Sequence, residues 1–376
     1  MRIAYLAASP IPSSVASSVQ VMKMCQGLAR LGHEVTLFAP IRAENRADVA
    51  DPFEFYGVEP AFTLRRVASS ADGRRLLFCA GAMAWAAHGA RPDLVYGRFT
   101  EAVALSADLG CPVVLEAHLP LRTTGPLGWV RRRLLRHRNL RRIVVVSDAL
   151  RQEYRTRYQV DETRLVVASD AADDPGDTAG ERLGPPDRLQ SVYVGNVYPG
   201  KGVETVVQLA EACPWADFHV VGGEAAQLQA WREPAARLAN LRFHGHVPHA
   251  QTDRYRLGAD VLLAPYHRRV ETHGAGEASR WMSPLKLFEY MAAGRAILVS
   301  DLPVLREVVR DDVHVLMCEP ESTAAWVVGL RRLADDPALR ERLGRAARAE
   351  FLRAHTWIAR AHAALNGLTQ DPIGSA

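Results

Sequence analysis

Lysine is almost absent from this chain of 376 residues. Lys and Arg together number 46, yet only Lys23, Lys201 and Lys286 are lysines, so the other 43 cations are arginines. An arginine bias by itself indicates nothing about function. In a chain that uses arginine by default, a lysine marks a position where a compact point charge is wanted, although survival of a few lysines by chance is also open. We therefore consider Lys201 and Lys286 together.

Cysteines are few, and long apolar runs are missing. The five cysteines are odd in number, scattered and without a C-x-x-C pair, which favours reduced thiols and a cytoplasmic protein and argues against a zinc site. The apolar run Leu76 to Ala87 is too short to span a bilayer and predicts a buried helix. Residues 1–8 predict a strand rather than a signal peptide.

Two ligand-binding motifs are also missing. There is no G-x-G-x-x-G, so a dinucleotide fingerprint is not supported, and no D-x-D that would hold a metal ion. We therefore expect no metal and no resident cofactor. The net charge of +4 permits anionic partners without requiring them.

Strands and helices alternate through the first half. The sequence predicts a strand over Arg2 to Leu6, a serine-rich loop over Ala7 to Ser18, a helix over Val19 to Leu31 and a strand over Val35 to Phe38. Such a unit begins a parallel sheet. The serine-rich loop either brings hydroxyls and N–H groups to a ligand or simply connects two elements. Further strands are predicted at Leu94 to Tyr96, Val113 to Glu116 and Ile143 to Val146.

A run of seven arginines lies between the last two of these strands. It extends from Arg131 to Arg142, with Trp129, Leu134 and Leu135 as an apolar side. One interpretation is contact with an anionic membrane surface, and the other is a solvated helix face. We expect no nucleic-acid partner, because the run lacks interleaved aromatic residues.

The alternation restarts after a stretch rich in Asp, Gly and Pro. We predict a linker over 169–189, an N-terminal Rossmann-like domain over 1–168 and a second one over 190–355. The second half predicts strands at 191–194, 218–221, 241–243, 261–263 and 296–299, and helices at 203–212, 252–257, 304–309, 323–334 and 337–353. A last amphipathic helix is predicted from Trp357.

The stretch Ser283-Pro284-Leu285-Lys286-Leu287-Phe288-Glu289 predicts the start of a central helix. Ser283 suits the N-cap and Pro284 the first helical position. Lys286 and Glu289 share one face near the end where the helix leaves N–H groups unpaired. A cation, N–H donors and a carboxylate suit a phosphate that carries hydroxyls, with Glu289 accepting from a diol. The alternative is a charged pair on a solvated helix.

With Lys201, Lys286 and Glu289 in the second of two such units, the chain resembles glycosyltransferases of the GT-B fold, in particular family 4. The resemblance covers nearly the whole length. It is carried, besides the central helix, by the segments LGHEV from Leu31, EAH from Glu116, VGNVYPGKG from Val194, FHGHV from Phe243, ADVLL from Ala259 and SDLP from Ser300.

The resemblance implies two Rossmann-like domains facing a cleft, with an acceptor held by the first and a nucleotide-sugar donor by the second. It implies retention at the anomeric carbon and a last helix, 356–376, that packs back on the first domain. Lys201 falls on the family's diphosphate-binding lysine, Glu289 on the glutamate that binds the ribose, and His118 on a histidine near the donor sugar. The other implied donor-binding residues are Asn196, Gly200, Gly245, Val247, Ser283 and Leu285.

Two positions depart from the family pattern. Asn196 stands where the family often has Arg, and Trp281 where it often has a second Glu. Lys286 would restore the lost positive charge. Glu271 or Glu277 would substitute for the missing carboxylate.

The expected function is a retaining glycosyltransferase. It would move a sugar from a nucleotide-diphosphate-sugar to a polysaccharide, lipid-linked or small aglycone acceptor. UDP is the more frequent nucleotide of the donor in such families. We expect it to be cytoplasmic, with or without peripheral attachment to a membrane. Lys201, Lys286 and the helix end would stabilise the charge that grows on the leaving diphosphate. The alternatives are another GT-B activity, such as a nucleotide-sugar epimerase or sugar-phosphate synthase, and a non-catalytic membrane-associated scaffold.

Overall fold

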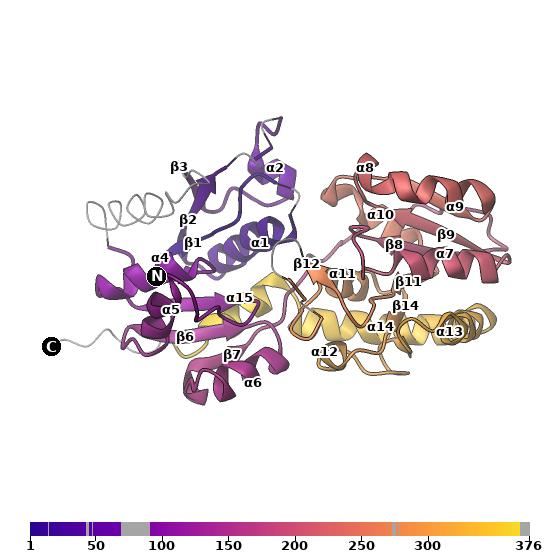
Figure 1. Ribbon diagram of the computed structural model, residues 1–376. Helices are drawn as coiled ribbons and strands as arrows, with labels where there is room; N and C mark the ends of the chain where they lie inside the picture. Colours follow the sequence, from indigo (N-terminus) through magenta and orange to yellow (C-terminus); the bar gives the residue numbers. More distant parts are fainter. Residues whose placement is uncertain are drawn as a thin grey trace. The chain divides into compact units, whose positions relative to one another are not determined.

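The computed structural model describes residues 1–13, 15–42, 45–46, 48–68, 91–272, 276–277 and 279–368. The chain divides into two compact units (Figure 1). Unit 1 comprises Met1–Asp170 and Trp357–Ala376, and unit 2 comprises Ala171–Thr356.

Unit 1 is built on a parallel sheet with strand order β3-β2-β1-β4-β5-β6-β7. Strands β2 and β3 follow on one side of β1, and strands β4 to β7 follow on its other side. Its strands are β1 (Arg2–Leu6), β2 (Glu34–Ile41), β3 (Thr63–Ala68), β4 (Leu94–Gly97), β5 (Val113–Ala117), β6 (Leu140–Val145) and β7 (Leu165–Val167). Its helices are α1 (Ala16–Arg30), α2 (Pro52–Tyr56), α4 (Thr100–Asp108), α5 (Gly128–Leu135), α6 (Asp148–Thr156) and α15 (Trp357–Leu365), with a 3-10 turn at Glu162–Arg164.

The last helix of the chain, α15, packs on the first helix, α1. A Cβ atom on Gly27 of α1 would lie 2.6 Å from the carbonyl oxygen of Trp357, so a glycine is needed for this close approach. The helix predicted over Leu76 to Ala87 lies outside the described residues. Strands β3 and β7 and helices α4 and α6 were not predicted; the strands are short, and α6 was missed although its apolar residues recur at helical spacing.

Unit 2 repeats the same parallel arrangement with strand order β10-β9-β8-β11-β14-β15. Its strands are β8 (Leu189–Val194), β9 (Ala216–Val221), β10 (Leu241–Gly245), β11 (Val261–Ala264), β14 (Ala296–Ser300) and β15 (Leu316–Cys318), beside a hairpin of β12 (Glu271–Thr272) and β13 (Gly276–Glu277). Its helices are α7 (Val203–Ala212), α8 (Ala225–Leu228), α9 (Arg232–Arg237), α10 (Asp253–Gly258), α11 (Leu285–Ala293), α12 (Pro303–Arg306), α13 (Thr323–Asp335) and α14 (Pro337–Ala354), with 3-10 turns at Gln229–Trp231 and His249–Gln251.

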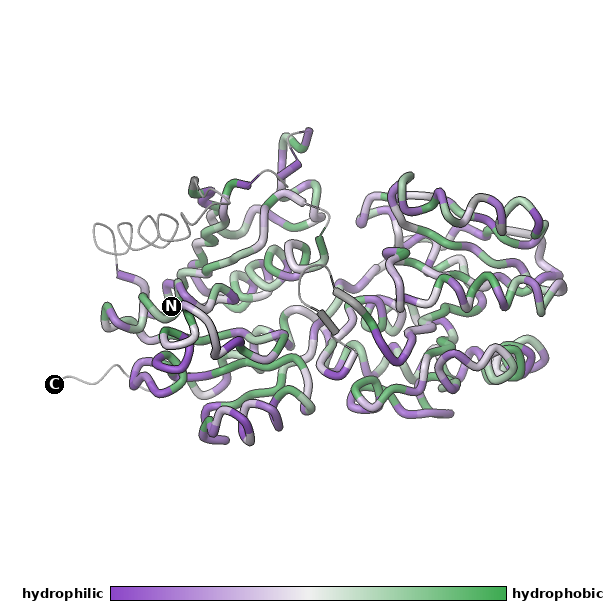
Figure 2. Tube along the Cα trace, viewed as in Figure 1, coloured by the Kyte–Doolittle hydropathy of each residue, from purple (hydrophilic) through white to green (hydrophobic). Residues whose placement is uncertain are grey.

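Figure 2 colours each described residue of the chain by its hydropathy. The central strands of unit 2 contribute apolar side chains to two separate cores, one on each face, as a doubly covered parallel sheet requires. Val192 and Val194 of β8 pack into a core with α10, α11 and α12. Tyr193, between them, packs into a core with α7 and α13 on the opposite face. Both units are therefore Rossmann-like domains, as predicted from the alternation of strands and helices.

The stretch predicted to be a linker packs against unit 2. Glu181 donates its N–H to the carbonyl oxygen of Arg254 at 2.9 Å, and Asp174 forms an ion pair with Arg348 at 2.8 Å. A Cβ atom on Gly180 would lie 2.5 Å from the backbone of Leu257. The chain therefore belongs to unit 2 from Ala171 onward.

Candidate active site

At the carboxyl ends of its strands, the unit 2 sheet opens between the central strands β8 and β11. The strand order reverses there, and α/β folds bind ligands at such a point. Backbone pairing between these strands ends at Val192 and Leu262. The hydroxyl of Tyr290, from α11, lies in the gap beyond. It accepts the N–H of Val194 at 2.7 Å and lies 3.3 Å from the carbonyl oxygen of Leu263, to which it can donate. This buried hydroxyl fastens α11 to the carboxyl ends of both strands.

Lys286 reaches the same edge from the first turn of α11. A Cβ atom on Gly195, directly after β8, would lie 2.9 Å from its Cε, and the φ of 148° at this position favours glycine. Its Nζ lies 3.4 Å from the ring centroid of Tyr193 and 5.2 Å from that of Tyr266. Lys286 is 8% exposed, and its Nζ has no hydrogen-bond partner within the described residues. The prediction of a solvated charged pair is therefore wrong for this lysine.

Lys201 approaches Tyr266 from a tight turn between β8 and α7. Its neighbours Gly200 and Gly202 have φ angles of 80° and 89°, a region that favours glycine. A Cβ atom on either glycine would collide with the backbone that follows β11. The Nζ of Lys201 lies 5.5 Å from the ring centroid of Tyr266, the ring that Lys286 also faces.

The electrostatics of this lysine pair favour an anionic ligand. Burial, and then repulsion from Lys201, hold the pKa of Lys286 well below its usual range, against the opposite pull of Glu289. Burial also lowers the pKa of Lys201. A cation over an aromatic face gains about 2 kcal/mol when desolvated. Removing an ammonium from water costs several kcal/mol, roughly twice that gain or more. Desolvation therefore outweighs the attraction of the tyrosine rings and disfavours the charged form of Lys286.

Glu289 lies one turn further along α11 and is partly buried. Its Oε2 accepts a hydrogen bond from Arg256 Nη1 at 3.0 Å, and its Oε1 lies 3.7 Å from Nε2 of His249. Arg256 is 3% exposed and also binds Asp253 Oδ1 at 2.8 Å. A carboxylate has about four lone-pair positions, so the Arg256 bond is compatible with further donors. Arg256 and Tyr290 were not predicted, because their roles depend on partners far away in sequence.

The start of α11 differs by one residue from the prediction. Pro284 occupies the N-cap position with a ψ of 118°, and no side chain caps the helix there. Ser283 therefore precedes the cap, since the ring of Pro284 already fixes its backbone in a suitable extended form. Leu285 is the first helical residue, so its N–H belongs to the groups that an α-helix leaves without intrahelical partners.

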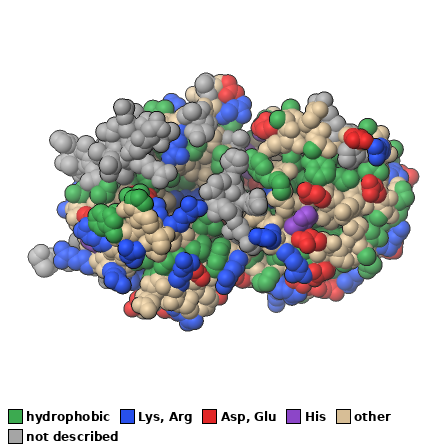
Figure 3. Space-filling model, viewed as in Figure 1, with side chains coloured by type: hydrophobic (Ala, Val, Ile, Leu, Met, Phe, Trp, Pro, Cys, Tyr) green, Lys and Arg blue, Asp and Glu red, His purple; other side chains and the backbone are tan. Residues whose placement is uncertain are grey.

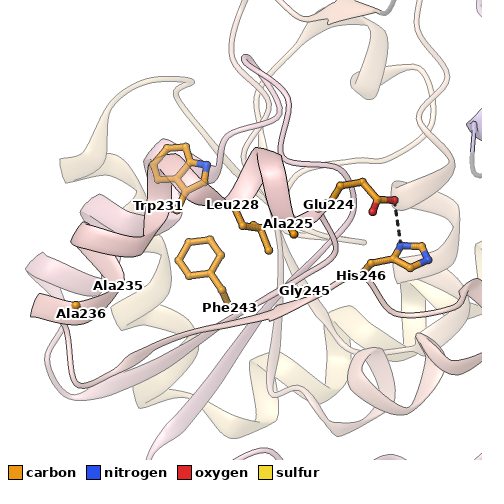
Figure 4. Close-up of a pocket in the computed structure, with 10 residues that line it drawn as sticks. Glu224, Ala225, Leu228, Trp231, Ala235, Ala236, Phe243, Gly245 and His246 are labelled. Carbon is orange, nitrogen blue, oxygen red and sulfur yellow. Dashed lines mark ion pairs between the residues drawn. The ribbon is translucent and has the colours of Figure 1, made fainter.

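A pocket of about 660 Å³ lies beside Gly245 at the carboxyl ends of β9 and β10 (Figure 4). The indole of Trp231 and the ring of Phe243 stack with centroids 6.4 Å apart on its inner side. At the other side, Glu224 and His246 lie 3.9 Å apart. Gly245 lines the pocket, whereas Val247 packs against the core that contains α11. The pocket offers apolar walls with polar groups at one end.

The two positions that depart from the family pattern lie in loops. Asn196 is exposed, and its backbone carbonyl oxygen accepts a hydrogen bond from the Tyr193 hydroxyl at 2.5 Å. The guanidinium of Arg280 lies 4.4 Å from the ring centroid of Trp281. Glu271 and Glu277 belong to the β12–β13 hairpin, but their side chains lie outside the described part of the chain.

His118 is in unit 1, directly after β5, again at the carboxyl edge of a sheet. Its Nε2 lies 2.6 Å from Glu116 Oε1, and its Nδ1 lies 4.0 Å from Asp170 Oδ2. Burial, and then the charge of Arg98, lower the pKa of His118. We therefore place the single proton of the neutral ring on Nε2, where the carboxylate accepts it. Nδ1 is then an acceptor for a ligand hydroxyl.

Glu116 is held by an arginine from the other end of the chain. Arg360, on α15, donates to Glu116 Oε1 at 3.0 Å, and Gln20 Nε2 donates to the same oxygen at 2.6 Å. The side chains of Glu116 and Arg360 are 0% and 1% exposed. Burial alone would raise the pKa of Glu116, but Arg360 and His118 hold it well below its usual range. This network fixes the orientation of the His118 ring.

The serine-rich loop after β1 is largely satisfied by its own hydroxyl groups. Ser9 Oγ donates to Ser17 Oγ at 3.0 Å, and Ser18 Oγ donates to the carbonyl oxygen of Pro10 at 2.7 Å. Tyr56 Oη accepts the N–H of Ser13 at 2.6 Å. These contacts support the interpretation as a connecting loop, because the hydroxyl groups are used within it.

The arginine run does not form one helix. Helix α5 ends at Leu135, and the run continues through a turn into strand β6. Arg131 binds Glu101 Oε1, Arg133 binds Asp108 and Arg142 donates to the carbonyl oxygen of Ala364. A second pocket, of about 620 Å³, is lined by Trp129, Arg132, Arg133, Arg136, His137 and Arg138. Figure 3 shows Lys and Arg side chains in blue over this part of the surface.

The predicted site residues thus fall into two groups. Lys201, Lys286 and Glu289 lie in unit 2 around the carboxyl ends of β8 and β11, and His118 lies in unit 1. No three His, Cys, Asp or Glu side chains gather in a way that could hold a metal ion in the described part of the chain. Over the same stretches, no helix is long and apolar enough to cross a membrane.

Two family models match this chain, one for each unit. The model described as Glycosyltransferase Family 4 matches residues 17–174, and the model described as Glycosyl transferases group 1 matches residues 180–350. The two matches are consecutive and together span most of the chain.

Curated relatives match over part of their length. Glycogen synthase of Mycobacterium tuberculosis is 30% identical over 196 residues, which are 50% of this chain and 43% of that protein. Phosphatidyl-myo-inositol mannosyltransferase of the same species is 33% identical over 169 residues, 42% of this chain and 41% of that protein. Alpha-D-kanosaminyltransferase of Streptomyces kanamyceticus is 25% identical over 271 residues, 64% of this chain and 65% of that protein. The chain thus spans less than half the length of the first two relatives.

Solved structures match over nearly the full length. HepE of Anabaena in complex with UDP has a TM-score of 0.71 at 14% identity and covers 99% of this chain and 100% of that one. Sucrose-phosphate synthase from Thermosynechococcus elongatus has a TM-score of 0.72 at 17% identity and covers 96% of each chain. At these identities the likeness shows the fold.

Proposed function

Because this chain belongs to the GT-B glycosyltransferases that resemble family 4, we propose that it moves a sugar from a UDP-sugar to an acceptor with retention at the anomeric carbon. The catalytic role falls to the lysine pair of unit 2. The observation that carries the proposal is the buried side-chain nitrogen of Lys286, which has no hydrogen-bond partner within the described residues and faces the same tyrosine ring as Lys201.

The lysine pair suits the departure of a diphosphate. When the bond between the sugar and the phosphate breaks, negative charge grows on the phosphate oxygens. Lys286, Lys201 and the N–H groups at the start of α11 are fixed donors at the edge where this charge develops. One such preorganised donor typically contributes about 3–4 kcal/mol to lowering a barrier. The proposed mechanism uses these groups without a metal ion.

The rest of unit 2 supports a nucleoside. Glu289, held by Arg256, is proposed to accept hydrogen bonds from the ribose hydroxyls. The pocket beside Gly245 offers the apolar rings of Trp231 and Phe243 near a nucleobase. The other proposed donor contacts come from Asn196, Gly200, Val247, Ser283 and Leu285. UDP is the proposed nucleotide because a similar structure, HepE of Anabaena, binds it.

We propose that unit 1 binds the acceptor, with His118 Nδ1 accepting from a sugar hydroxyl. The curated relatives include an enzyme named for phosphatidyl-myo-inositol, which supports a lipid-linked acceptor. The pocket lined by Arg132, Arg136 and Arg138, beside the exposed Trp129, supports contact with an anionic membrane surface.

The proposal is tested by calorimetric titration with UDP, GDP, ADP and dTDP in the absence of added metal. We expect micromolar binding of UDP and weaker binding of the other three. Absence of binding by all four nucleotides would contradict the donor site. Product analysis with the corresponding UDP-sugars then reports the anomeric configuration.

A further inference from the structure

We infer that Lys286 takes up a proton from solvent when the diphosphate of the donor binds. The inference rests on the donor site proposed above. Proton uptake by the protein does not follow from the charge of the ligand alone, because a permanently charged cation would bind the same anion without any change in protonation.

The geometry around the amine carries the inference. Lys286 is 92% buried, its Nζ has no hydrogen-bond partner within the described residues, and two tyrosine rings cover it at 3.4 and 5.2 Å. An ammonium group has three N–H donors, and leaving them unused in a buried site is costly. A neutral amine in the same place loses much less on burial.

The charged and titratable groups around Lys286 come from every element packed at this edge. They are Tyr193 on β8, Lys201 before α7, Tyr266 after β11, and Glu289 and Tyr290 on α11, with Glu204 in the first turn of α7 acting on Tyr193. Lys201 repels a charge on Lys286. Glu289 attracts it, but its carboxylate is already bound by Arg256. Burial raises the pKa of all three tyrosines, so they are neutral phenols at physiological pH.

A bound diphosphate reverses this balance. Its oxygens supply acceptors for the N–H groups and negative charge within the same buried space, so the charged form of Lys286 becomes favoured. The amine nitrogen forms one new N–H bond, and the proton comes from the buffer. Arginine could not work in this way, because its guanidinium is not deprotonated in proteins.

The experiment is calorimetric titration with UDP in Tris, HEPES and Tricine at about pH 8.5, where a terminal phosphate with a second pKa near 6 carries no proton. The apparent enthalpy plotted against the ionisation enthalpy of the buffer gives the protons taken up. We expect about 0.5–1 proton per UDP bound for the unaltered protein. The matched variants are Lys286→Arg, expected to bind UDP with uptake near zero, and Lys201→Arg, expected to keep most of the uptake.

A second measurement needs no variant, because the chain has only three lysines. Lysine labelled with ¹³C at Cε gives three resonances, whose shifts report the charge of each amine. We expect one resonance to move from the neutral to the charged position on addition of UDP. The resonance of Lys23, which binds the carbonyl oxygen of Gly57 at 2.7 Å, should stay in place.

The outcomes separate the two proposals. Two results would overturn the inference and leave the proposed donor site intact. One is UDP binding without proton uptake, and the other is proton uptake that is abolished in Lys201→Arg and kept in Lys286→Arg. Absence of UDP binding by the unaltered protein would overturn both.

Discussion

The proposed ribose contact of Glu289 is tested most sharply by Glu289→Gln. The more drastic Glu289→Ala would leave the Arg256 guanidinium, which is 3% exposed, with Asp253 as its remaining ion-pair partner. Removing one member of a buried pair costs about 3–5 kcal/mol of stability, which would mix folding with binding. Glutamine keeps the shape of the side chain and an oxygen acceptor for Arg256 while removing the charge.

The expected loss follows from the kind of hydrogen bond. A hydrogen bond to a charged group contributes about 1.5–3 kcal/mol, and each 1.4 kcal/mol is tenfold in affinity. If a ribose hydroxyl donates to the Glu289 carboxylate, UDP should bind the Glu289→Gln variant about 10- to 100-fold more weakly. Chemical denaturation should show a smaller loss of unfolding free energy than the about 3–5 kcal/mol of a broken pair, because Asp253 still binds Arg256 at 2.8 Å.

The assay compares UDP with 2′-deoxy-UDP on both proteins. The unaltered protein should prefer UDP by about tenfold or more, and the variant should discriminate little, because the acceptor that senses the 2′-hydroxyl has lost its charge. Glu341→Gln, at an exposed glutamate of α14, is the matched control and should behave as the unaltered protein. An unchanged preference for UDP in Glu289→Gln would refute the ribose contact, whatever happens to the absolute affinity.

Three further perturbations test the rest of the structure. Tyr290→Phe removes the hydroxyl that accepts the Val194 N–H, so urea denaturation should show a loss of about 1–3 kcal/mol; a smaller loss would mean that the gap between β8 and β11 closes without it. Arg360→Met should cost about 3–5 kcal/mol near neutral pH. Because the folded pKa of Glu116 is depressed, its stabilisation is present above its unfolded pKa and is lost as pH falls through the folded value. Without Arg360, burial favours the protonated carboxyl of Glu116, so the loss of unfolding free energy in Arg360→Met, followed by circular dichroism in urea, should shrink as pH falls from neutral into the acid range; a loss that stays constant with pH would contradict this linkage. Serine replacement of the three arginines that line the second pocket, Arg132, Arg136 and Arg138, should reduce sedimentation of the protein with anionic vesicles. Serine replacement of three exposed arginines of unit 2, Arg237, Arg345 and Arg353, is the control and should not reduce it. Equal effects of the two replacements would mean that only general electrostatic attraction is at work.

Much of the fold was predictable because apolar runs and their spacing are local properties. The strand over Arg2 to Leu6 and the helix over Val203 to Ala212 were predicted with the observed bounds. The alternation of such elements was enough to predict two Rossmann-like units. The end of the helix within the arginine run was harder to predict. The helical spacing continues in the sequence into β6, and the position where the helix ends depends on the pairing of β6 with β5, which is a tertiary effect.

The candidate site could be proposed from the sequence residue by residue, but its contacts could not. Lys286 and Glu289 were named because the start of a helix has a local signature, and Lys201 was named because lysines are scarce and its segment resembles family 4. The partners that fix them could not. Arg256 lies 33 residues from Glu289, and Arg360 lies 244 residues from Glu116. No local pattern connects residues so far apart, because only the folded sheet brings them together.

The structure gives a physical reason for a lysine, rather than an arginine, at position 286. The buried arginines have carboxylate partners: Arg256 binds Glu289 and Asp253, and Arg360 binds Glu116. A guanidinium stays charged in a protein, so its burial requires such a partner. Lys286 is nearly as buried, yet its Nζ has no hydrogen-bond partner within the described residues. Lysine tolerates this position because it can lose its proton, and it can regain that proton when an anion arrives. An arginine there would carry its charge before the diphosphate arrives, at a cost in stability that a neutral lysine avoids.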